Sequence, residues 1–351
     1  MLRIWRNFAV RLILPICLLQ SVAACAQAPE PIPDFEREEQ VVEDRLQHFI
    51  FIGGAELSNH KDLLARDDID GAQVIYNWRR LEPREGEYQF EKIERELELA
   101  DRLGKRLFIQ VQDRFFLPES RYLPDYILEE PKYGGGLVRQ EDNPGEGADK
   151  GSGWVAAQWN PELRARFQAL LTALGERFDG RVYGINLPET AIEVPTGDDA
   201  PAGFTCDIYF DAEMENLRAA RAVFQHSLVV QYVNFWPCEW NNDRQYMSRL
   251  FELGKAEGIG MGGPDIIPYR RAQEKNAYQF LESMGTELPV VAMAVQGPTL
   301  TYTNPQTGRK FTRAEFESYA VSKLNVDIIF WSLRTPWLRE EYANEREAET
   351  G

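Results

Sequence analysis

Histidine and cysteine are scarce in this chain of 351 residues, which contains three of the former and four of the latter. No cysteine and histidine cluster has the spacing of a structural zinc site. A Ser-His-Asp hydrolase is poorly supported as well, because only His60, and that weakly, accompanies a good nucleophile. The sequence therefore predicts neither a zinc centre nor a serine hydrolase.

Basic charge is also in deficit, with 39 lysines and arginines against 56 aspartates and glutamates and a net charge of −17. Nucleic acids need a basic surface to neutralise their phosphates, so we expect no nucleic-acid partner. The glycines at 134–136 lack the following Lys-Ser/Thr of a phosphate-binding loop. No motif implies a cofactor, and the acidity is explained by solubility.

Only one region combines a long apolar run with basic residues before it, and it lies at the N-terminus. Arg3 and Arg6 precede the run Leu12–Leu19, which is too short to span a bilayer comfortably. A basic start, a short apolar core and small residues behind it are typical of a secretion signal. The sequence predicts a signal peptide over residues 1–24.

Small residues directly before Cys25 resemble a bacterial lipobox. The resemblance implies cleavage before Cys25 and a diacylglycerol anchor on its sulfur. The alternative is an ordinary signal peptide cut near Ala24 or Ala26. By analogy, Ala26 after the cysteine favours the outer membrane, with the protein facing the periplasm and touching the membrane only through its lipid anchor.

Two further cysteines, Cys206 and Cys238, lie in the body of the chain. In an oxidising periplasm they could form a disulfide. Each follows an apolar, strand-like segment by a comparable stretch, so both could lie on one face of the fold. The alternative is two separate buried thiols.

The remaining chain has room for one large domain. We expect an acidic, proline-containing linker over residues 25–46, a single domain over residues 47–338 and a polar tail over residues 339–351. This length fits a single β/α barrel.

Short apolar runs alternate with helical patterns through this domain. The runs are continuous, as expected for strands of a parallel sheet buried on both faces. They are residues 48–53, 73–78, 106–112, 182–186, 228–234, 258–262, 290–295 and 326–331. Asn160 before Pro161 predicts a helix start, and Thr312 with Glu315 has capping-box spacing.

Eight strands with intervening helices predict a single (β/α)₈ barrel. A doubly wound sheet is the alternative, but the chain has no dinucleotide-binding fingerprint. The longest interruption, at about residues 115–158, is rich in glycine and should lie at the C-terminal rim, where it could cover a site.

Active sites of β/α barrels lie where the strands end. In this chain the residues that follow the predicted strands are mainly carboxylates, amides and tryptophans. Amides and carboxylates bind sugar hydroxyls, and indole rings cover the flat faces of sugars. We therefore expect a carbohydrate ligand. The candidate substrate-binding residues are Trp78, Gln112, Asn186, Asn234, Trp236, Gln296 and Trp331.

Several of these residues have structural alternatives. Trp331 could fill the barrel top, and Trp236 could clamp Cys238. Gln112 and Asn234 could satisfy the barrel interior.

The segment Trp78-Arg-Arg-Leu-Glu-Pro-Arg-Glu-Gly-Glu-Tyr-Gln-Phe90 resembles the Trp-x-x-Leu-Glu-Pro-x-x-Gly-x-Tyr-x-Phe segment after strand two of barrel glycoside hydrolases. The similarity is to clan A, notably its β-galactosidase-like members, and covers one βα unit. It implies the barrel fold and a glycosidase ancestry. The segment itself reads as scaffold, with Glu82 as an ion-pair partner of Arg79 or Arg80.

Clan A enzymes carry an acid/base glutamate after strand four, often preceded by Asn, and a nucleophilic glutamate after strand seven. Glu189 matches the first position approximately, although Pro188 directly precedes it and Asn186 lies three residues back. The second position departs from the family, because the strand-seven segment carries Gln296 and no carboxylate.

Three mechanisms remain open. Glu189 could be the general acid with Asp265 as the base for water, although Asp265 could instead cap the following helix; Glu56 and Glu193 are alternative partners. A substrate acetamido group could replace the nucleophile, but no paired-acid motif supports this. In the third interpretation the barrel binds glycan without hydrolysing it.

The sequence thus predicts hydrolysis of a glycosidic bond in an oligo- or polysaccharide, with Glu189 and Asp265 as catalytic residues. The competing hypothesis is a catalytically inactive glycan-binding lipoprotein on a glycosidase-like barrel.

Overall fold

The computed structural model describes residues 46–141 and 153–339, in which eight parallel strands close into a barrel. The order around the barrel is β1-β11-β10-β9-β8-β7-β3-β2. The strands are β1 (Gln47–Phe51), β2 (Gly71–Asn77), β3 (Arg106–Gln112), β7 (Gly184–Leu187), β8 (Leu228–Tyr232), β9 (Gly260–Gly263), β10 (Val291–Val295) and β11 (Ile328–Ser332). This confirms the predicted (β/α)₈ barrel and excludes a doubly wound sheet, which would be open.

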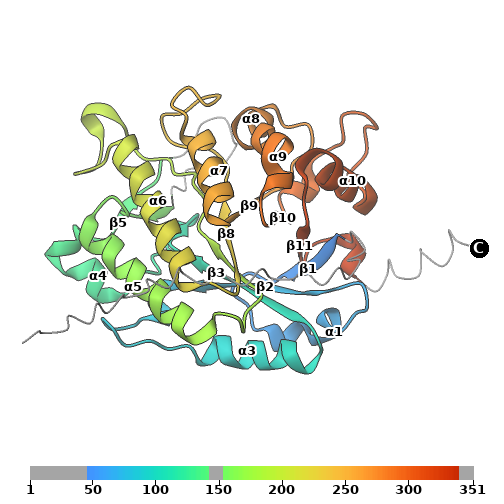
Figure 1. Cartoon of the computed structure of the whole chain (residues 1–351), viewed down its shortest axis with the longest axis horizontal. Helices are drawn as coiled ribbons and strands as arrows, with labels where there is room; N and C mark the ends of the chain where they lie inside the picture. The colour runs from blue at the N-terminus through green and yellow to red at the C-terminus, as the bar shows by residue number, and fades with distance from the viewer. Residues whose placement is uncertain (1–45, 142–152, 340–351) are drawn as a thin grey trace, which may run out of the picture. The chain divides into compact units, whose positions relative to one another are not determined.

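Helices cover the outside of the barrel, as Figure 1 shows. The two predicted helix starts are confirmed: the Asn160 side chain accepts from the first-turn N–H groups, and Thr312 with Glu315 forms a capping box. The helices are α1 (Lys61–Leu64), α2 (Trp78–Leu81), α3 (Glu91–Arg102), α5 (Pro161–Phe178), α6 (Cys206–Val223), α7 (Tyr246–Glu257), α8 (Arg271–Gln273), α9 (Gln279–Met284) and α10 (Arg313–Leu324). A π-helical segment, Glu274–Tyr278, joins α8 to α9.

Aromatic rings fill the lower, N-terminal half of the barrel interior. Phe49, Phe108 and Phe330 meet edge to face, with ring centroids 5.2–6.5 Å apart. Glycines on the neighbouring strands make room for them. A Cβ on Gly184 would lie 2.4 Å from the Phe108 ring, and one on Gly71 would lie 2.4 Å from the Phe49 ring. Gly184 and Gly71 thus permit a tightly packed floor beneath the functional end of the barrel.

The interruption after β3 forms a small subdomain of its own. It contains β4 (Arg114–Phe115), α4 (Asp125–Glu129), β5 (Leu137–Arg139) and β6 (Trp154–Ala156). The strands make an antiparallel sheet in the order β4-β6-β5. The long interruption predicted here therefore contains strands and a helix of its own, joined by turns and irregular segments.

The segment from Trp78 to Phe90 is a brace centred on the buried side chain of Glu82. The Glu82 carboxylate is fully buried and accepts hydrogen bonds from Trp78 Nε1 and from the Gly86 N–H, each at 2.8 Å. It also forms an ion pair with Arg166 of α5. The segment therefore fastens the end of β2 to α5.

The predicted pairing of Glu82 with Arg79 or Arg80 is wrong. Arg79 instead pairs with Asp125 of α4 at 2.8 Å, and Arg80 is exposed. The short helix α2 points both arginines outward and leaves Glu82 facing the brace.

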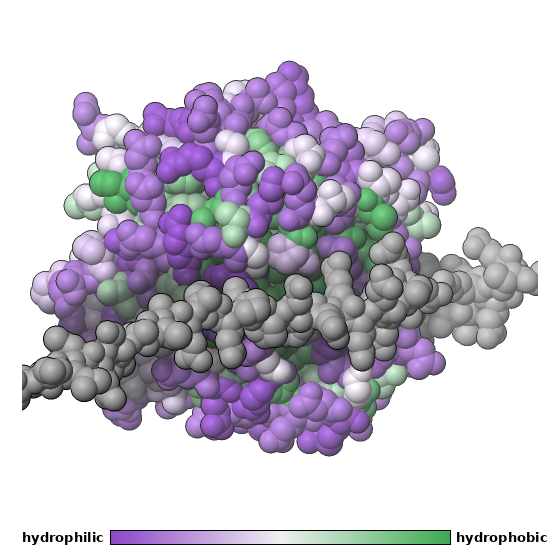
Figure 2. Space-filling view, viewed as in Figure 1, coloured by the Kyte–Doolittle hydropathy of each residue, from purple (hydrophilic) through white to green (hydrophobic). Residues whose placement is uncertain are grey.

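The predicted signal peptide, Cys25, nearly all of the linker and residues 340–351 lie outside the described residues. Within residues 46–141 and 153–339, no helix has the length and apolar character needed to cross a membrane. Hydrophilic residues dominate the face of the molecule shown in Figure 2.

Candidate active site

Glu189 lies two residues beyond β7, at the C-terminal mouth of the barrel. Its half-buried carboxylate accepts a hydrogen bond from Asn234 Nδ2 at 3.2 Å. The next residue is tied to β8, because the Thr190 N–H donates to the Tyr232 carbonyl at 3.0 Å. Thr190 Oγ1 also donates to the Phe235 carbonyl at 2.8 Å. The end of β8 and the loop that follows it therefore hold Glu189 in place.

Asn234 serves as a positioning group for this carboxylate. Its Oδ1 accepts from Gln273 Nε2 at 2.9 Å while its Nδ2 donates to Glu189. An amide Nδ2 has two hydrogens, so one donor of Asn234 remains for a ligand. The residue was predicted to bind substrate, and the structure adds an orienting contact to the candidate acid.

Asp265 stands two residues beyond β9. Its half-buried carboxylate accepts from Thr299 Oγ1 at 2.7 Å, and its backbone carbonyl accepts from the Tyr278 hydroxyl at 2.8 Å. The alternative that Asp265 caps the next helix is wrong, because α8 has Arg270 at its N-cap position and no side-chain cap.

The charges of both carboxylates affect the pKa of the Tyr232 hydroxyl. Burial raises the pKa of Tyr232 well above its usual value; the hydrogen bond from Gln73 Nε2 at 2.7 Å opposes this, and the charges of Asp265 and Glu189 add to it. Both carboxylates thus act electrostatically on one buried hydroxyl. Glu189 and Asp265 each lie two residues beyond a strand, at the same C-terminal end of the barrel.

Buried amides lie beneath the mouth. Gln73 Nε2 donates to Asn186 Oδ1 at 2.9 Å, and both side chains are fully buried. Gln73 Oε1, Asn186 Nδ2 and Gln231 Oε1 have no hydrogen-bond partner among the described residues. Asn186 was predicted to touch substrate, but it lies below the surface and could do so only through its unused Nδ2.

Two further predicted amides lie at the mouth itself and are half-buried. Gln112 accepts from Gln110 Nε2 at 3.3 Å and donates to the Arg114 carbonyl at 2.5 Å, so much of its capacity satisfies the protein. Gln296 follows β10 directly. Ala292 and Ala294 belong to the inner core, so alternation along the strand places Gln296 on the inner side too.

The three predicted tryptophans are core residues, and their expected role in covering a sugar is wrong. Trp78 and Trp331 are fully buried, and Trp236 is nearly so. Each packs against a helix: Trp78 against Phe167 of α5, Trp236 against Phe210 of α6, and Trp331 against Phe316 of α10. No ring face is left for a ligand.

The strand pleat explains one of these errors. Along β11, Phe330 points into the barrel, so its neighbour Trp331 points outward to the helices. The Trp331 Nε1 donates to His48 Nδ1 at 3.0 Å. Because burial lowers the pKa of His48, with the charge of Arg313 adding to the effect, the imidazole stays neutral and can accept.

Exposed aromatic side chains occur instead on the longer loops at the mouth. Phe116 and Tyr122 follow β3, Trp240 follows β8 and Tyr269 follows β9. Trp240 is 53% exposed, and the Lys275 ammonium lies 5.5 Å from its ring centroid. Sequence reasoning missed these rings because it considered only the first residues after each strand. The turn-rich segment around Trp240 was the available signal.

The loop that carries Trp240 is held by several devices. Cys206 and Cys238 form a disulfide between the start of α6 and this loop, in agreement with the predicted pairing. Glu239 accepts from the backbone N–H groups of Tyr246 and Met247, at 2.6 and 3.2 Å, and so caps α7. Four residues of the loop have a positive φ. This backbone conformation is strained for residues other than glycine and persists only where the surrounding contacts hold it in place. The four residues are Cys238, Asn241, Asn242 and Gln245.

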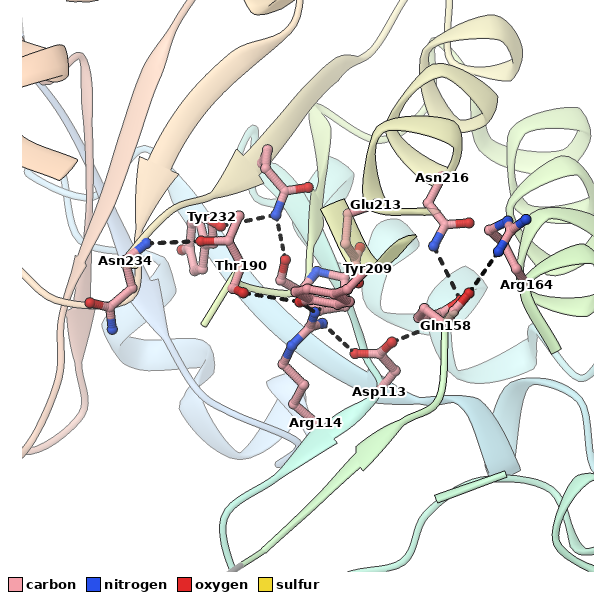
Figure 3. A network of polar contacts seen from close by, with 12 residues as sticks. Asp113, Arg114, Gln158, Arg164, Thr190, Tyr209, Glu213, Asn216, Tyr232 and Asn234 are labelled. Atoms are coloured by element: carbon pink, nitrogen blue, oxygen red, sulfur yellow. Dashed lines mark hydrogen bonds and ion pairs between the residues drawn. The ribbon is translucent and has the colours of Figure 1, made fainter. Parts of the chain in front are cut away.

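A buried network of charged side chains reaches the backbone of Thr190, as Figure 3 shows. Arg114 donates to Asp113 at 2.7 Å, to Glu213 at 2.9 Å and to the Tyr209 hydroxyl at 2.5 Å. The Tyr209 hydroxyl donates in turn to the carbonyl of Thr190 at 3.0 Å. The network therefore reaches the backbone beside the candidate acid.

The network contains one guanidinium, that of Arg114, and two carboxylates, those of Asp113 and Glu213. Burial raises the pKa of Glu213 to about 7, although the nearby Arg114 charge lowers it and the Asp113 charge raises it. Burial opposes the charged form of Arg114, but Asp113 and the other acidic groups around it raise its pKa. We infer that Arg114 stays charged while Glu213 holds a proton under mildly acidic conditions.

Residues 46–141 and 153–339 contain no cluster of three or more His, Cys, Asp or Glu side chains able to hold a metal ion. The groups assembled at the mouth are carboxylates, amides and aromatic rings. Such a set can exchange protons and bind hydroxyl-rich ligands.

No family model and no curated protein sequence matches this chain. Among solved structures, the catalytic domain of the β-amylase from Paenibacillus polymyxa is similar, with a TM-score of 0.54 and 9% identity over 83% of this chain and 92% of that one. The β-galactosidase of the psychrophilic Marinomonas ef1 has a TM-score of 0.52 and 10% identity over 82% of this chain and 54% of that one. The fold is that of barrel glycoside hydrolases.

The barrel of this chain carries a carboxylate after its fourth strand and an amide after its seventh. Counting around the barrel, β7 is the fourth strand and β10 the seventh. Glu189 follows the former and Gln296 follows the latter. An amide cannot attack as a carboxylate nucleophile, so a second acid must come from another strand if the barrel hydrolyses sugars.

Proposed function

We propose that the protein hydrolyses a glycosidic bond in an oligo- or polysaccharide, with Glu189 as general acid and Asp265 as general base. The observation that carries the proposal is that two half-buried carboxylates lie at the same C-terminal mouth of one closed barrel, each two residues beyond a strand. A pair of carboxylates flanking the scissile bond is the minimum that acid/base glycoside hydrolysis requires.

In this mechanism Glu189 gives its proton to the leaving oxygen as the bond to the anomeric carbon breaks. Asp265 takes a proton from a water molecule, whose oxygen forms the new bond to that carbon from the opposite side. The step ends with Glu189 ionised and Asp265 protonated, and exchange with solvent resets both. Because Asp265 acts as a base on water and not as a nucleophile in this mechanism, the reaction inverts the anomeric configuration.

The surrounding groups have matching tasks. Asn234 orients Glu189, and Thr299 orients Asp265. Exposed rings such as Trp240 supply flat apolar surface for a sugar. The similar structures are, by their names, a β-amylase and a β-galactosidase, which supports a carbohydrate substrate at the level of the fold.

The test is a hydrolysis assay of the full chain on a panel of glycans, with Glu189→Gln and Asp265→Asn beside the parent protein. We expect either change to lower kcat by about 10²-fold or more, because each removes a proton-transfer group. Glu215→Gln is the matched control, since Glu215 is an exposed carboxylate of α6 paired with Arg164. Unchanged turnover in Glu189→Gln would contradict the assignment. Proton NMR of the first product should show the inverted anomer.

A second candidate function is glycan binding without hydrolysis, and Gln296 at the seventh strand favours it. In that case Trp240→Ala would weaken glycan binding while no member of the panel is cleaved by the parent protein. Cleavage of any glycan that depends on Glu189 would exclude this candidate.

We also propose that the protein is exported and anchored by a diacylglycerol on Cys25 at the bacterial outer membrane, facing the periplasm. The support is the N-terminal sequence pattern alone. Expression with labelled palmitate should label the parent protein, and Cys25→Ser should abolish the label. A labelled Cys25→Ser variant would contradict the anchor.

A further inference from the structure

The helix α8 and the π-helical segment behind it, residues 271–278, form a wide turn that contacts the loops at the barrel mouth. Gln273 of this wide turn donates from Nε2 to Asn234 Oδ1 at 2.9 Å. Asn234 in turn donates from Nδ2 to Glu189 Oε2 at 3.2 Å. The wide turn therefore reaches the proposed general acid through one intervening amide.

The hydrogen bond from Gln273 decides which way the Asn234 amide points. An asparagine side chain has one acceptor oxygen and one donor nitrogen. Because the oxygen accepts from Gln273, the nitrogen is the atom that faces Glu189. The backbone of Asn234 is held separately, since its N–H donates to Thr190 Oγ1 at 3.3 Å. Without the Gln273 donor, the amide could turn over, and the hydrogen bond to Glu189 would be lost.

The other end of the wide turn holds the backbone of the proposed base. The Tyr278 hydroxyl donates to the Asp265 carbonyl and accepts from the Ile267 N–H, each at 2.8 Å. The Tyr278 side chain is almost fully buried, and its ring lies 6.3 Å from that of Tyr319 in α10. Tyr278 therefore fastens the loop after β9 to the helix layer.

The π-helical geometry explains how one short segment serves both loops. Gln273 and Tyr278 are five residues apart. In a regular α-helix this spacing rotates two side chains about 140° away from each other. A π-helical turn instead closes over five residues, and such turns often occur at functional sites. The wide turn thus lets one side chain reach the loop after β8 and the other the loop after β9.

We propose that Gln273 and Tyr278 are positioning residues for the two carboxylates of the proposed reaction. Gln273 orients Glu189 through Asn234, and Tyr278 fixes the backbone of Asp265. A catalytic group misplaced by about 1 Å can cost about 10²-fold in rate, so the contacts of the wide turn bear directly on turnover. The inference rests on the proposed function and identifies the element that holds its acid and its base.

The test uses two substrates that differ in their need for an acid. One is a glycan that the parent protein cleaves, and the other is the dinitrophenyl glycoside of the same sugar. Dinitrophenolate is a weak base and leaves without being protonated, whereas a sugar alkoxide needs the proton. Gln273→Met removes the donor and keeps the chain length. We expect it to lower kcat on the glycan by about tenfold or more, with KM nearly unchanged, and kcat on the dinitrophenyl glycoside by less than about twofold.

Two controls isolate the contact with Asn234. In a protein that already carries Asn234→Ala, adding Gln273→Met should lower kcat on the glycan no further, because the intervening amide is gone. Gln225→Met should leave kcat on both substrates unchanged. Gln225 is an exposed glutamine after α6, and its amide donates to the Ala222 carbonyl.

Tyr278→Phe tests the base side. It removes the hydroxyl that joins the Asp265 carbonyl to the Ile267 N–H. We expect kcat per folded molecule to fall by about tenfold on both substrates, because water must be activated whichever group leaves. Circular dichroism gives the folded fraction of this variant and of Gln273→Met. The two variants should therefore differ in their response to the leaving group.

The outcomes separate this positioning role from the proposed function. Equal losses on the two substrates in Gln273→Met, or a further loss in the Asn234→Ala protein, overturn the role of Gln273. An unchanged kcat in folded Tyr278→Phe overturns the role of Tyr278.

If the parent protein cleaves no glycan, the proposed function fails, and the side-chain amide NMR signals of Asn234 decide the contact by themselves. These signals are identified by their absence in Asn234→Ala. They should shift or broaden in Gln273→Met, and unchanged signals overturn the orienting role of Gln273.

Discussion

The lower and upper halves of the barrel interior are built from different kinds of side chain. The lower half is closed by Phe49, Phe108 and Phe330, packed against glycines that leave no space unused. The upper half holds Gln73 and Asn186, with polar atoms that the described protein does not satisfy. An unpaired buried polar atom costs free energy that aromatic packing does not, so the upper half carries a stability penalty. The difference indicates that the lower half serves folding and the upper half serves a ligand.

The largest expected effect on stability comes from the lower half. Phe108→Ala should reduce the free energy of unfolding by about 3–5 kcal/mol, because it empties the space among three rings. Urea denaturation measures this loss, and kcat per folded molecule should stay close to that of the parent. A loss of activity larger than the loss of folded protein would break the division between the halves.

The charged network beside the upper half should make stability depend on pH. Glu213 has a pKa of about 7 in the folded protein, raised by burial from an ordinary value of 4.5. Between these pH values the folded state keeps a proton that the unfolded state has lost. The free energy of unfolding should therefore fall as pH rises through this window, by up to about 3 kcal/mol.

Glu213→Gln is the control for this slope, since the amide cannot ionise. Chemical denaturation at several pH values between 4.5 and 7.5 should show a flatter profile in the variant. The same slope in both proteins would assign the pH dependence to another group.

Two tryptophans near the mouth should respond in opposite ways. Trp240→Ala should weaken glycan binding by about two- to tenfold, corresponding to about 0.5–1.5 kcal/mol, and leave the melting temperature nearly unchanged because the ring is exposed. Trp331→Ala should instead lower the melting temperature strongly through the cavity it leaves. Calorimetric titration and thermal denaturation of both variants test the contrast, which fails if Trp331→Ala changes affinity alone.

A small stability change should come from the upper half itself. Asn186→Leu removes the unpartnered Nδ2 and leaves Gln73 Nε2 bonded to the Tyr232 hydroxyl. We expect the free energy of unfolding to change by no more than about 1 kcal/mol while turnover drops. A variant that unfolds readily but retains kcat would show that these amides are structural.

The strand pattern of the sequence was sufficient to predict the barrel. Eight continuous apolar runs correspond to the eight strands within a few residues, since burial on both faces demands such runs. The sequence also predicted the glycine-rich strand β9, although glycine is uncommon in strands. Its glycines allow close packing, as a Cβ on Gly262 would lie 1.8 Å from the Ala292 carbonyl oxygen.

The candidate site was less predictable because side-chain direction at a strand end depends on single-residue register. A shift of one residue turns a side chain from the mouth to the helix layer, as happened for Trp331. The Arg114 network was also missed, since its members come from β4, the residue before it and α6, and only the folded chain brings them together. Chain order carries little information about such pairings.

The contacts around Glu82 separate the part of the sequence that resembles other barrels from the rim residues that would carry the chemistry. The contacts of Glu82 with Trp78, Gly86 and Arg166 centre on a fully buried carboxylate, and none belongs to the groups that would handle a sugar. The residues that carry the resemblance to barrel glycoside hydrolases therefore brace the barrel, and the rim positions that would carry the chemistry could change without altering any of these contacts.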